Sequence, residues 1–434
     1  MLKTVLYFLI FSPTFLFAQN VNLKTVLNEA SAGSPLIEKS QAQYDEVSWK
    51  KTEALQGFLP TLTGGINYYT LKKYTLTDIN LGSGPVSVPQ IVPTTTYSLT
   101  ATIPLFDGFA STNRYLAGSH LEKSAQLDLD WTRFSLQKNI TLQFYKVIAA
   151  RSLKEVSEQN LKTLTDHLKD AEALKKAGIA TSYDVLRVEV QVSEAKAEIL
   201  NASDNFEIAK NKLGELLGKD TESRDLEGSF PKISNETLQT AKVLKLSSRA
   251  DLLALQEKSQ SLQNLDSAAG RYWVPKIGAF GQYQYYNNIN DHFSDSDHFR
   301  ESYLVGLNMT WNLFDGMGSI AKSHQAAAQS IQLQANVKIT ELKAKQDFEF
   351  WKRKLNYFKT IYDSKIIDIE KSSESVRLAQ AGRRAGTRTS TDLLDSELDL
   401  FRSRASLVNA QIGLVESIIN IELSTGLSIY DFEK

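Results

Sequence analysis

The chain has 434 residues and a formal net charge of −1 at pH 7, so no global electrostatic field draws it toward nucleic acid or an acidic surface. It contains no cysteine, which excludes disulfides, thiolate catalysis, zinc–thiolate sites and lipidation of an N-terminal cysteine. No Walker, dinucleotide-binding, nucleophile-elbow or zinc-protease motif is present. We therefore expect no enzyme, no cofactor, no metal site and no nucleic-acid partner.

The N-terminus has the pattern of a secretory signal peptide. Lys3 supplies a positive charge, Thr4 to Phe17 is mostly apolar, and Ala18 is a small residue at a plausible cleavage point. We predict a signal peptide over residues 1–18; the alternative is an N-terminal membrane anchor. No later stretch offers about 20 consecutive apolar residues. The exported chain is therefore either soluble or enters a membrane as strands.

The first half of the chain changes its hydrophobic period several times. Apolar residues recur every three or four positions over residues 21–56, which predicts helix, and Pro35 fits a new helix start. A two-residue period with aromatics and threonine predicts strands at about residues 60–70 and 96–106. Residues 71–93 are rich in Gly, Pro, Ser and Thr and are predicted to be a loop.

A helical pattern without proline then covers about residues 111–176, a length on the order of 100 Å. A helix of that length requires partner helices, as in a coiled coil. Gly178 interrupts the pattern, and a returning helix is predicted to run to about Leu217, followed by Gly218.

The same order of elements follows again. Strands are predicted at about residues 275–286 and 301–314, and a second long helix extends over about 320–380. Gly386 interrupts that helix as Gly178 does the first, 208 positions earlier (386 − 178 = 208). This spacing indicates a duplication. We predict a first repeat over residues 19–218, a connector over 219–245 and a second repeat over 246–434.

The four predicted strands have one apolar and one polar face. Open sheet edges are not tolerated in lipid, and small barrels need about eight strands, so one chain is insufficient. Aromatic residues near the strand ends resemble the girdles of membrane barrels. These aromatics are Tyr68, Tyr97, Tyr283, Tyr303 and Trp311. Several chains that each contribute four strands would solve the problem, and three chains would give twelve.

Short motifs recur within the duplicated plan. They are Phe58-Leu59-Pro60, Leu105-Phe106-Asp107-Gly108, Arg249-Ala250-Asp251-Leu252, Leu313-Phe314-Asp315-Gly316 and Ala385-Gly386-Thr387-Arg388-Thr389 with Thr391-Asp392-Leu393-Leu394-Asp395. On this plan and these motifs, nearly the whole mature chain resembles the TolC-like outer-membrane efflux proteins. The resemblance implies a mainly helical homotrimer with a twelve-stranded β-barrel in the outer membrane and a long periplasmic α-helical barrel. It also implies docking to a periplasmic adaptor attached to an inner-membrane pump.

The resemblance places Gly178 and Gly386 at the periplasmic end. Asp392 and Asp395 share one helix face there, so three chains would form an acidic ring around an aperture. The alternative for Asp392 is ordinary capping of a helix N-terminus.

Arg383 and Arg388 are expected to form a latch with nearby acids, and Asp184 is the expected acceptor. The family often has an aromatic where Arg383 stands, so an ion pair would replace that contact. A solvated helix end is the alternative for Arg383. The expected adaptor-docking tip comprises Gly178, Ile179, Ala180, Thr181, Gly386, Thr387, Arg388 and Thr389.

A second strand–strand loop contains a cluster of acids and histidines whose spacing fits no known metal-ligand pattern, so we expect it to be merely polar. These residues are Asp291, His292, Asp295, Asp297 and His298. The sequence as a whole predicts a passive outer-membrane duct, gated at its periplasmic tip, of a tripartite efflux or type I secretion system. The alternative is a secreted, soluble coiled-coil scaffold or adhesin. The cargo is not encoded in any motif.

Overall fold

The computed structural model describes residues 21–70, 75–80, 82, 84–90, 93–219, 226–233, 249–287 and 296–432. The chain divides into two compact units. One comprises Met1–Gln41, Asp128–Leu252 and Ile339–Lys434, and the other comprises Ala42–Leu127 and Leu253–Lys338. The predicted signal peptide and most of the predicted connector over 219–245 lie outside the described residues. No helix in the described part of the chain is both long enough and apolar enough to span a membrane.

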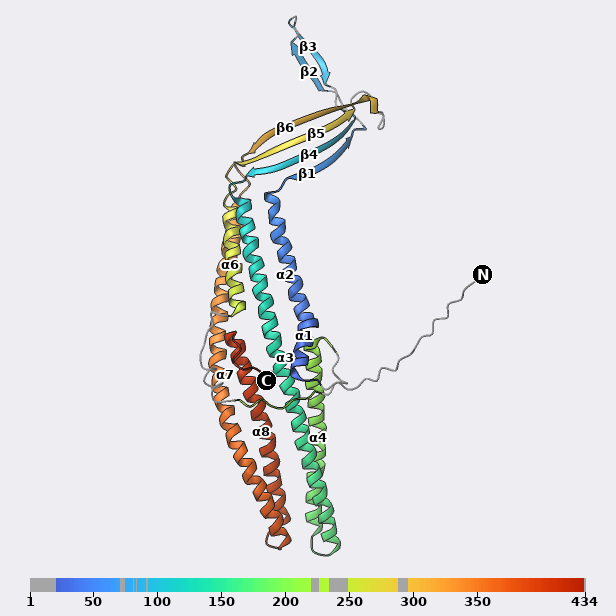
Figure 1. Ribbon diagram of the computed structural model, residues 1–434, viewed down its shortest axis with the longest axis vertical. Coiled ribbons are helices and arrows are strands. Elements are labelled where there is room, and N and C mark those ends of the chain that lie inside the picture. The colour runs from blue at the N-terminus through green and yellow to red at the C-terminus, as the bar shows by residue number, and fades with distance from the viewer. Residues whose placement is uncertain are drawn as a thin grey trace, which may run out of the picture. The chain divides into compact units, whose positions relative to one another are not determined.

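The second unit contains a four-stranded antiparallel sheet in the order β1-β4-β5-β6. Its strands are β1 (Thr61–Tyr68), β4 (Thr95–Phe106), β5 (Lys276–Asn287) and β6 (Phe299–Thr310). The central pair, β4 and β5, joins the two halves of the chain, and β1 and β6 are the outer strands (Figure 1). Duplication in the sequence therefore becomes a single sheet in space.

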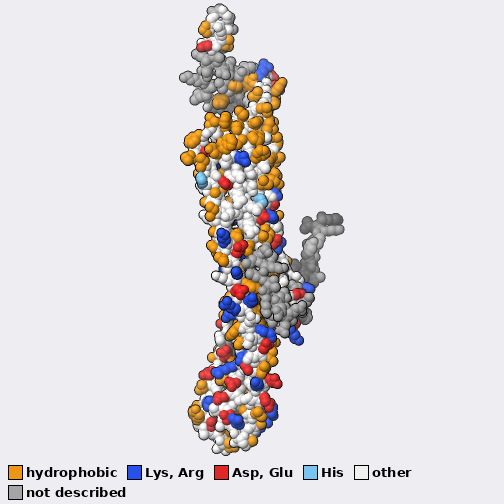
Figure 2. All heavy atoms as spheres, turned by 90° about the vertical axis from the view of Figure 1, so that its left-hand side faces the viewer, with side chains coloured by type: hydrophobic (Ala, Val, Ile, Leu, Met, Phe, Trp, Pro, Cys, Tyr) orange, Lys and Arg blue, Asp and Glu red, His pale blue; other side chains and the backbone are white. Residues whose placement is uncertain are grey.

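One face of this sheet is apolar and exposed. Tyr303 pairs with Tyr283, and Leu307 pairs with Ala279; directly paired residues lie on the same face. On β6 the exposed fraction is 82% for Tyr303 and 72% for Leu307. Figure 2 shows hydrophobic side chains gathered over the strands of this unit. The two-residue period therefore gives a surface suited to lipid.

Two predictions about the strands were wrong. The predicted loop at 71–93 contains a hairpin of β2 (Thr75–Asn80) and β3 (Pro85–Gln90). Both strands of a two-stranded ribbon are edges, where proline is tolerated, so the proline content was misleading. The predicted last strand ends early, at Thr310. Its partner β5 begins at Lys276, which pairs with Thr310, so no ladder partner remains for Trp311.

The long helices confirm the duplication. Helices α3 (Ala110–Lys176) and α7 (Gly318–Arg384) both have 67 residues, and α4 (Ser182–Leu217) and α8 (Ser390–Thr425) both have 36. Every bound is repeated 208 positions later. Shorter helices are α1 (Leu23–Gly33), α2 (Pro35–Glu53), α6 (Ala250–Ala269) and the 3₁₀ turns η1 (Ala54–Gly57) and η3 (Ser296–His298).

The first unit has a continuous apolar core built from α1, α3, α4, α7 and α8. Among its fully buried side chains are Ile140 and Phe144 of α3, Leu213 of α4 and Ile418 of α8. Arg249, the residue before α6, connects the start of α6 to the last turn of α8. It donates to the Asp251 carboxylate at 2.6 and 3.0 Å and to the Ser424 carbonyl at 3.2 Å. The Arg-Ala-Asp-Leu motif is therefore a structural clamp.

Candidate functional site: two helical hairpin tips

The first hairpin tip joins α3 to α4. Gly178 has φ 74°, a conformation that L side chains rarely adopt, and a Cβ there would meet no atom within 4 Å. Backbone geometry, and not crowding, therefore requires glycine. Thr181 caps α4 and forms a capping box with Asp184. The Thr181 amide and hydroxyl donate to Asp184 Oδ2 at 2.9 and 2.7 Å, and the Asp184 amide donates back at 3.2 Å.

The second tip, between α7 and α8, repeats this construction. Gly386 has φ 76°, and Thr389 forms a capping box with Asp392. The Thr389 amide and hydroxyl each donate to Asp392 Oδ2 at 2.9 Å. A Cβ at Gly382 would lie 2.6 Å from Cγ of Arg388, so this glycine allows the arginine to pack against the end of α7.

Both capping carboxylates are stabilised in their charged form. Hydrogen bonds from Thr181 lower the pKa of Asp184, and hydrogen bonds from Thr389 lower the pKa of Asp392. The nearby positive charge of Arg388 lowers the pKa of Asp392 further. The capping interpretation of Asp392 is therefore confirmed, and it leaves a negative charge at the tip.

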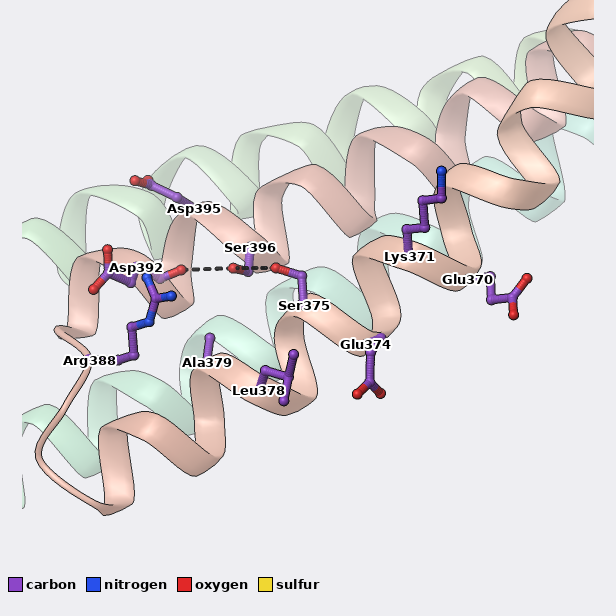
Figure 3. A pocket seen from close by; sticks show the side chains of 10 residues that line it. All are labelled: Glu370, Lys371, Glu374, Ser375, Leu378, Ala379, Arg388, Asp392, Asp395 and Ser396. Carbon is purple, nitrogen blue, oxygen red and sulfur yellow. Dashed lines mark hydrogen bonds between the residues drawn. The ribbon is translucent and has the colours of Figure 1, made fainter.

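Asp392 and Asp395 line a groove of about 640 Å³ between α7 and α8 (Figure 3). In Figure 3, Arg388 extends from the turn toward Asp392. Leu378 and Ala379 supply the apolar part of the lining, and Glu370 and Glu374 add two more carboxylates. Acids thus outnumber the basic residues that line this groove.

Within one chain, Arg383 has a different partner from the one predicted. Its Nη2 lies 3.6 Å from Oδ2 of Asp170, and its Nη1 lies 3.3 Å from Nδ1 of His167. The expected acceptor, Asp184, instead accepts the hydrogen bonds of its own capping box. The prediction chose Asp184 as the acid of the other hairpin tip without knowing which helix faces meet. Arg383, however, ends α7 beside α3, whereas Asp184 begins α4.

His167 and Glu397 were not identified from the sequence. His167 Nε2 lies 2.6 Å from Glu397 Oε1, and Glu397 is only 6% exposed. Arginine can only donate, so Nδ1 of His167 accepts from Arg383, and Nε2–H donates to Glu397. The sequence did contain a sign that Glu397 is buried, because its spacing places it on the same helix face as the apolar residues Leu393 and Leu394.

A second unpredicted contact joins the two return helices. Arg187 Nη1 donates to the Thr391 hydroxyl at 2.8 Å, and its Nη2 lies 3.8 Å from Oδ1 of Asp395. Arg187 and Asp395 are themselves 208 positions apart, so two equivalent positions carry opposite charges and lie side by side. The repeat offset alone would have suggested this pair.

An apolar stripe begins at the first tip. Its four members follow one another at intervals of four, three and four positions, and their exposed fractions lie between 58% and 74%. They are Ile179, Tyr183, Leu186 and Val190. This is the spacing of a coiled-coil seam. The second repeat lacks an equivalent, because Leu394, at the position of Leu186, is 4% exposed.

The acid- and histidine-rich strand–strand loop that was expected to be merely polar is only partly described, so that expectation stays a prediction. Asp291, His292 and Asp295 lie outside the described residues, and Asp297 and His298 belong to η3. Among the described residues, no group of three or more His, Cys, Asp or Glu side chains is arranged to hold a metal ion.

Comparison with known proteins gives consistent results along the chain. Residues 26–219 and 243–427 match the family model described as "Outer membrane efflux protein". The chain is 19% identical over 417 residues to outer membrane protein TolC of Vibrio cholerae, covering 93% of this chain and 90% of that protein.

Solved structures share the fold. VceC of Vibrio cholerae has a TM-score of 0.77 at 16% identity, with 94% of this chain and 97% of that chain covered. The CmeC outer membrane channel of Campylobacter jejuni has a TM-score of 0.76 at 13% identity, with 93% and 85% covered.

Proposed function

Because this chain belongs to the outer membrane efflux protein family, we propose that it is the passive exit duct of a tripartite efflux or type I secretion system. In this proposal an inner-membrane pump supplies the energy, a periplasmic adaptor connects pump and duct, and the duct opens and closes at its hairpin tips. The soluble scaffold or adhesin that the sequence left open is set aside, since it does not account for an efflux-family chain.

The exposed sheet face is the observation that carries the duct proposal. The four-stranded sheet has two outer strands, β1 and β6, and an apolar face of the kind that contacts lipid. Open sheet edges are not tolerated in the membrane interior. A sheet loses its edges only when it closes into a barrel, and a barrel needs about eight or more strands. Three copies would contribute twelve strands in a closed barrel, with β1 of one copy beside β6 of the next.

The apolar stripe at the first tip supports adaptor docking. The seam of a coiled coil is offered by side chains that stay exposed in the described part of one chain: Ile179, Tyr183, Leu186 and Val190. A helical hairpin of an adaptor would cover this seam. The border of the contact would be formed by the other tip residues: Gly178, Ala180, Thr181, Gly386, Thr387, Arg388 and Thr389.

The acidic groove supports a gate at the same end. In a trimer, Asp392 and Asp395 would supply six carboxylates around one aperture, which would favour cations. Arg187 already neutralises part of the charge of Asp395 within the chain. An exposed pair of this kind contributes about 0–1 kcal/mol, so a closed state would require several of them, repeated by symmetry.

The duct is tested with purified protein in detergent and in planar bilayers. We expect a trimer that conducts ions after reconstitution, and a monomer without conductance would refute the duct. Docking is tested by placing a photoreactive residue at Ile179 or Tyr183, with the exposed Leu342 of α7 as a matched control. Cross-linking to the adaptor at the tip positions, but not at Leu342, is the expected result.

A further inference from the structure

A pocket of about 390 Å³ in the second unit is lined by four cationic side chains. They come from four segments of the chain: the first turns of α3, the residues after α6, the first residue of β5 and the first turns of α7. The four are Arg114, Arg271, Lys276 and Lys322. No residue that lines this pocket carries a carboxylate, and Ser319, Tyr272 and two glutamines add further polar groups.

The acids nearest along the chain are already engaged. Asp107 accepts from the Ser111 amide at 2.7 Å, and Asp315 accepts from the Ser319 amide at 2.9 Å. Asp266 accepts a hydrogen bond from the Ser323 hydroxyl. None of the four cations forms an ion pair with any residue that the structure describes. Their four charges therefore line the pocket without a directly paired carboxylate among the residues that the structure describes.

Four like charges around one cavity repel each other, and a bound anion would remove that cost. Phosphate suits these residues well. Its several oxygens accept from the planar forks of Arg114 and Arg271, and lysine ammonium groups bind it as point charges. A lone carboxylate has only two acceptor oxygens, and it would leave much of the positive charge unpaired.

The neighbourhood of the pocket resembles a membrane–water boundary. Trp273 lies between Arg271 and Lys276 in the sequence, and it is 58% exposed. Trp311 is 56% exposed, and its indole N–H donates to the Trp273 carbonyl at 2.8 Å. Exposed tryptophan is typical of the headgroup level of a bilayer. Basic pockets at that level bind anionic lipid headgroups.

We propose that this pocket is a binding site for a phosphate group. Two sources share this chemistry: the headgroup of an anionic phospholipid, and a phosphate-bearing anion dissolved in the water of the duct. The site is separate from the hairpin tips and requires no adaptor or pump.

The test compares the intact protein with the pocket variant Arg114→Gln/Lys322→Gln. The control variant, Lys343→Gln/Lys345→Gln, removes two exposed lysines of the same helix α7 away from the pocket. Each protein is placed in nanodiscs of phosphatidylcholine with or without phosphatidylglycerol, and native mass spectrometry counts the phospholipids that remain bound after release. A parallel titration measures pyrophosphate binding to the detergent-solubilised protein.

We expect the intact and control proteins to bind at least one phosphate-bearing ligand, and the pocket variant to bind it at least tenfold more weakly. Retention of phosphatidylglycerol alone identifies a headgroup site, and pyrophosphate binding identifies a site for dissolved anions. Absence of both, or equal binding by the pocket variant, would overturn the proposal. A second variant, Arg271→Gln/Lys276→Gln, must reproduce the loss, and an unchanged oligomer and circular dichroism spectrum exclude misfolding.

Discussion

The buried ion pair between Lys138 of α3 and Glu422 of α8 offers the sharpest test of how the first unit is held together. The Lys138 side chain is 6% exposed and that of Glu422 is 0% exposed. Oε1 of Glu422 accepts from the amides of Ile429 and Tyr430 at 2.6 and 2.9 Å. Oε2 has no hydrogen-bond partner among the described residues, and its compensation is the Lys138 charge, with Nζ 2.9 Å away.

We predict that Lys138→Met lowers the free energy of unfolding of this unit by about 3–5 kcal/mol. The attraction across 2.9 Å is about 6 kcal/mol at an effective dielectric constant of about 20, and part of it is offset by desolvation of both charges. The large cost arises because Lys138→Met removes the charge that compensates Glu422 in its fully buried position. Removing both charges together, in Lys138→Met/Glu422→Gln, should cost much less than the sum of the single changes.

The measurement is denaturant unfolding of the detergent-solubilised protein, followed by helical circular dichroism and by fluorescence. The single variants and the double variant form a double-mutant cycle. Two outcomes would show that the pair does not anchor the segment after α8. One is a loss of unfolding free energy below about 1 kcal/mol in the single variants, and the other is a loss in the double variant equal to the sum of the single losses.

Four further predictions concern the hairpin tips. Thr389→Ala should remove the α8 cap and cost about 0.5–2 kcal/mol of local stability, seen as faster amide hydrogen exchange in the first turn of α8; unchanged exchange would contradict it. Folding lowers the pKa of Asp184 and Asp392, so the stability that these caps give to α4 and α8 should be complete at neutral pH and lost as pH falls below about 4. In Asn variants, the protection of the capped amides from hydrogen exchange should not change over this pH range. In bilayers under a KCl gradient, Asp392→Asn/Asp395→Asn should reduce the preference of the channel for cations. An unchanged reversal potential would refute the proposed acidic ring. His167→Phe should release Arg383 and leave Glu397 without its donor, so we expect more frequent opening; conductance identical to that of the intact protein would exclude a role in closure.

Local chemistry explains why the hairpin tips were predictable. A glycine at positive φ and a Thr–Asp capping box are encoded within a few residues, so Gly178, Gly386, Thr181 and Thr389 could be placed from the sequence. The two-residue period likewise identified all four strands of the main sheet, although it placed the end of the last one too late.

The contacts between helices were not predictable in the same way. The partners of Arg383 depend on which faces of α3 and α7 meet, and those faces are set by packing along the entire helices. Composition was a poor guide to the β2–β3 hairpin, because both strands of a two-stranded ribbon are edges, where proline is tolerated. The sequence was therefore most informative where structure depends on neighbouring residues.

The contact between Arg187 and Asp395 makes the two repeats different in charge at one equivalent position. These residues occupy equivalent positions of the two repeats and attract each other across α4 and α8. Two copies of the first repeat would bring arginine against arginine at this contact, and two copies of the second would bring aspartate against aspartate. Because these equivalent positions carry opposite charges, the two halves are complementary here, and replacing either repeat by a copy of the other would place like charges side by side.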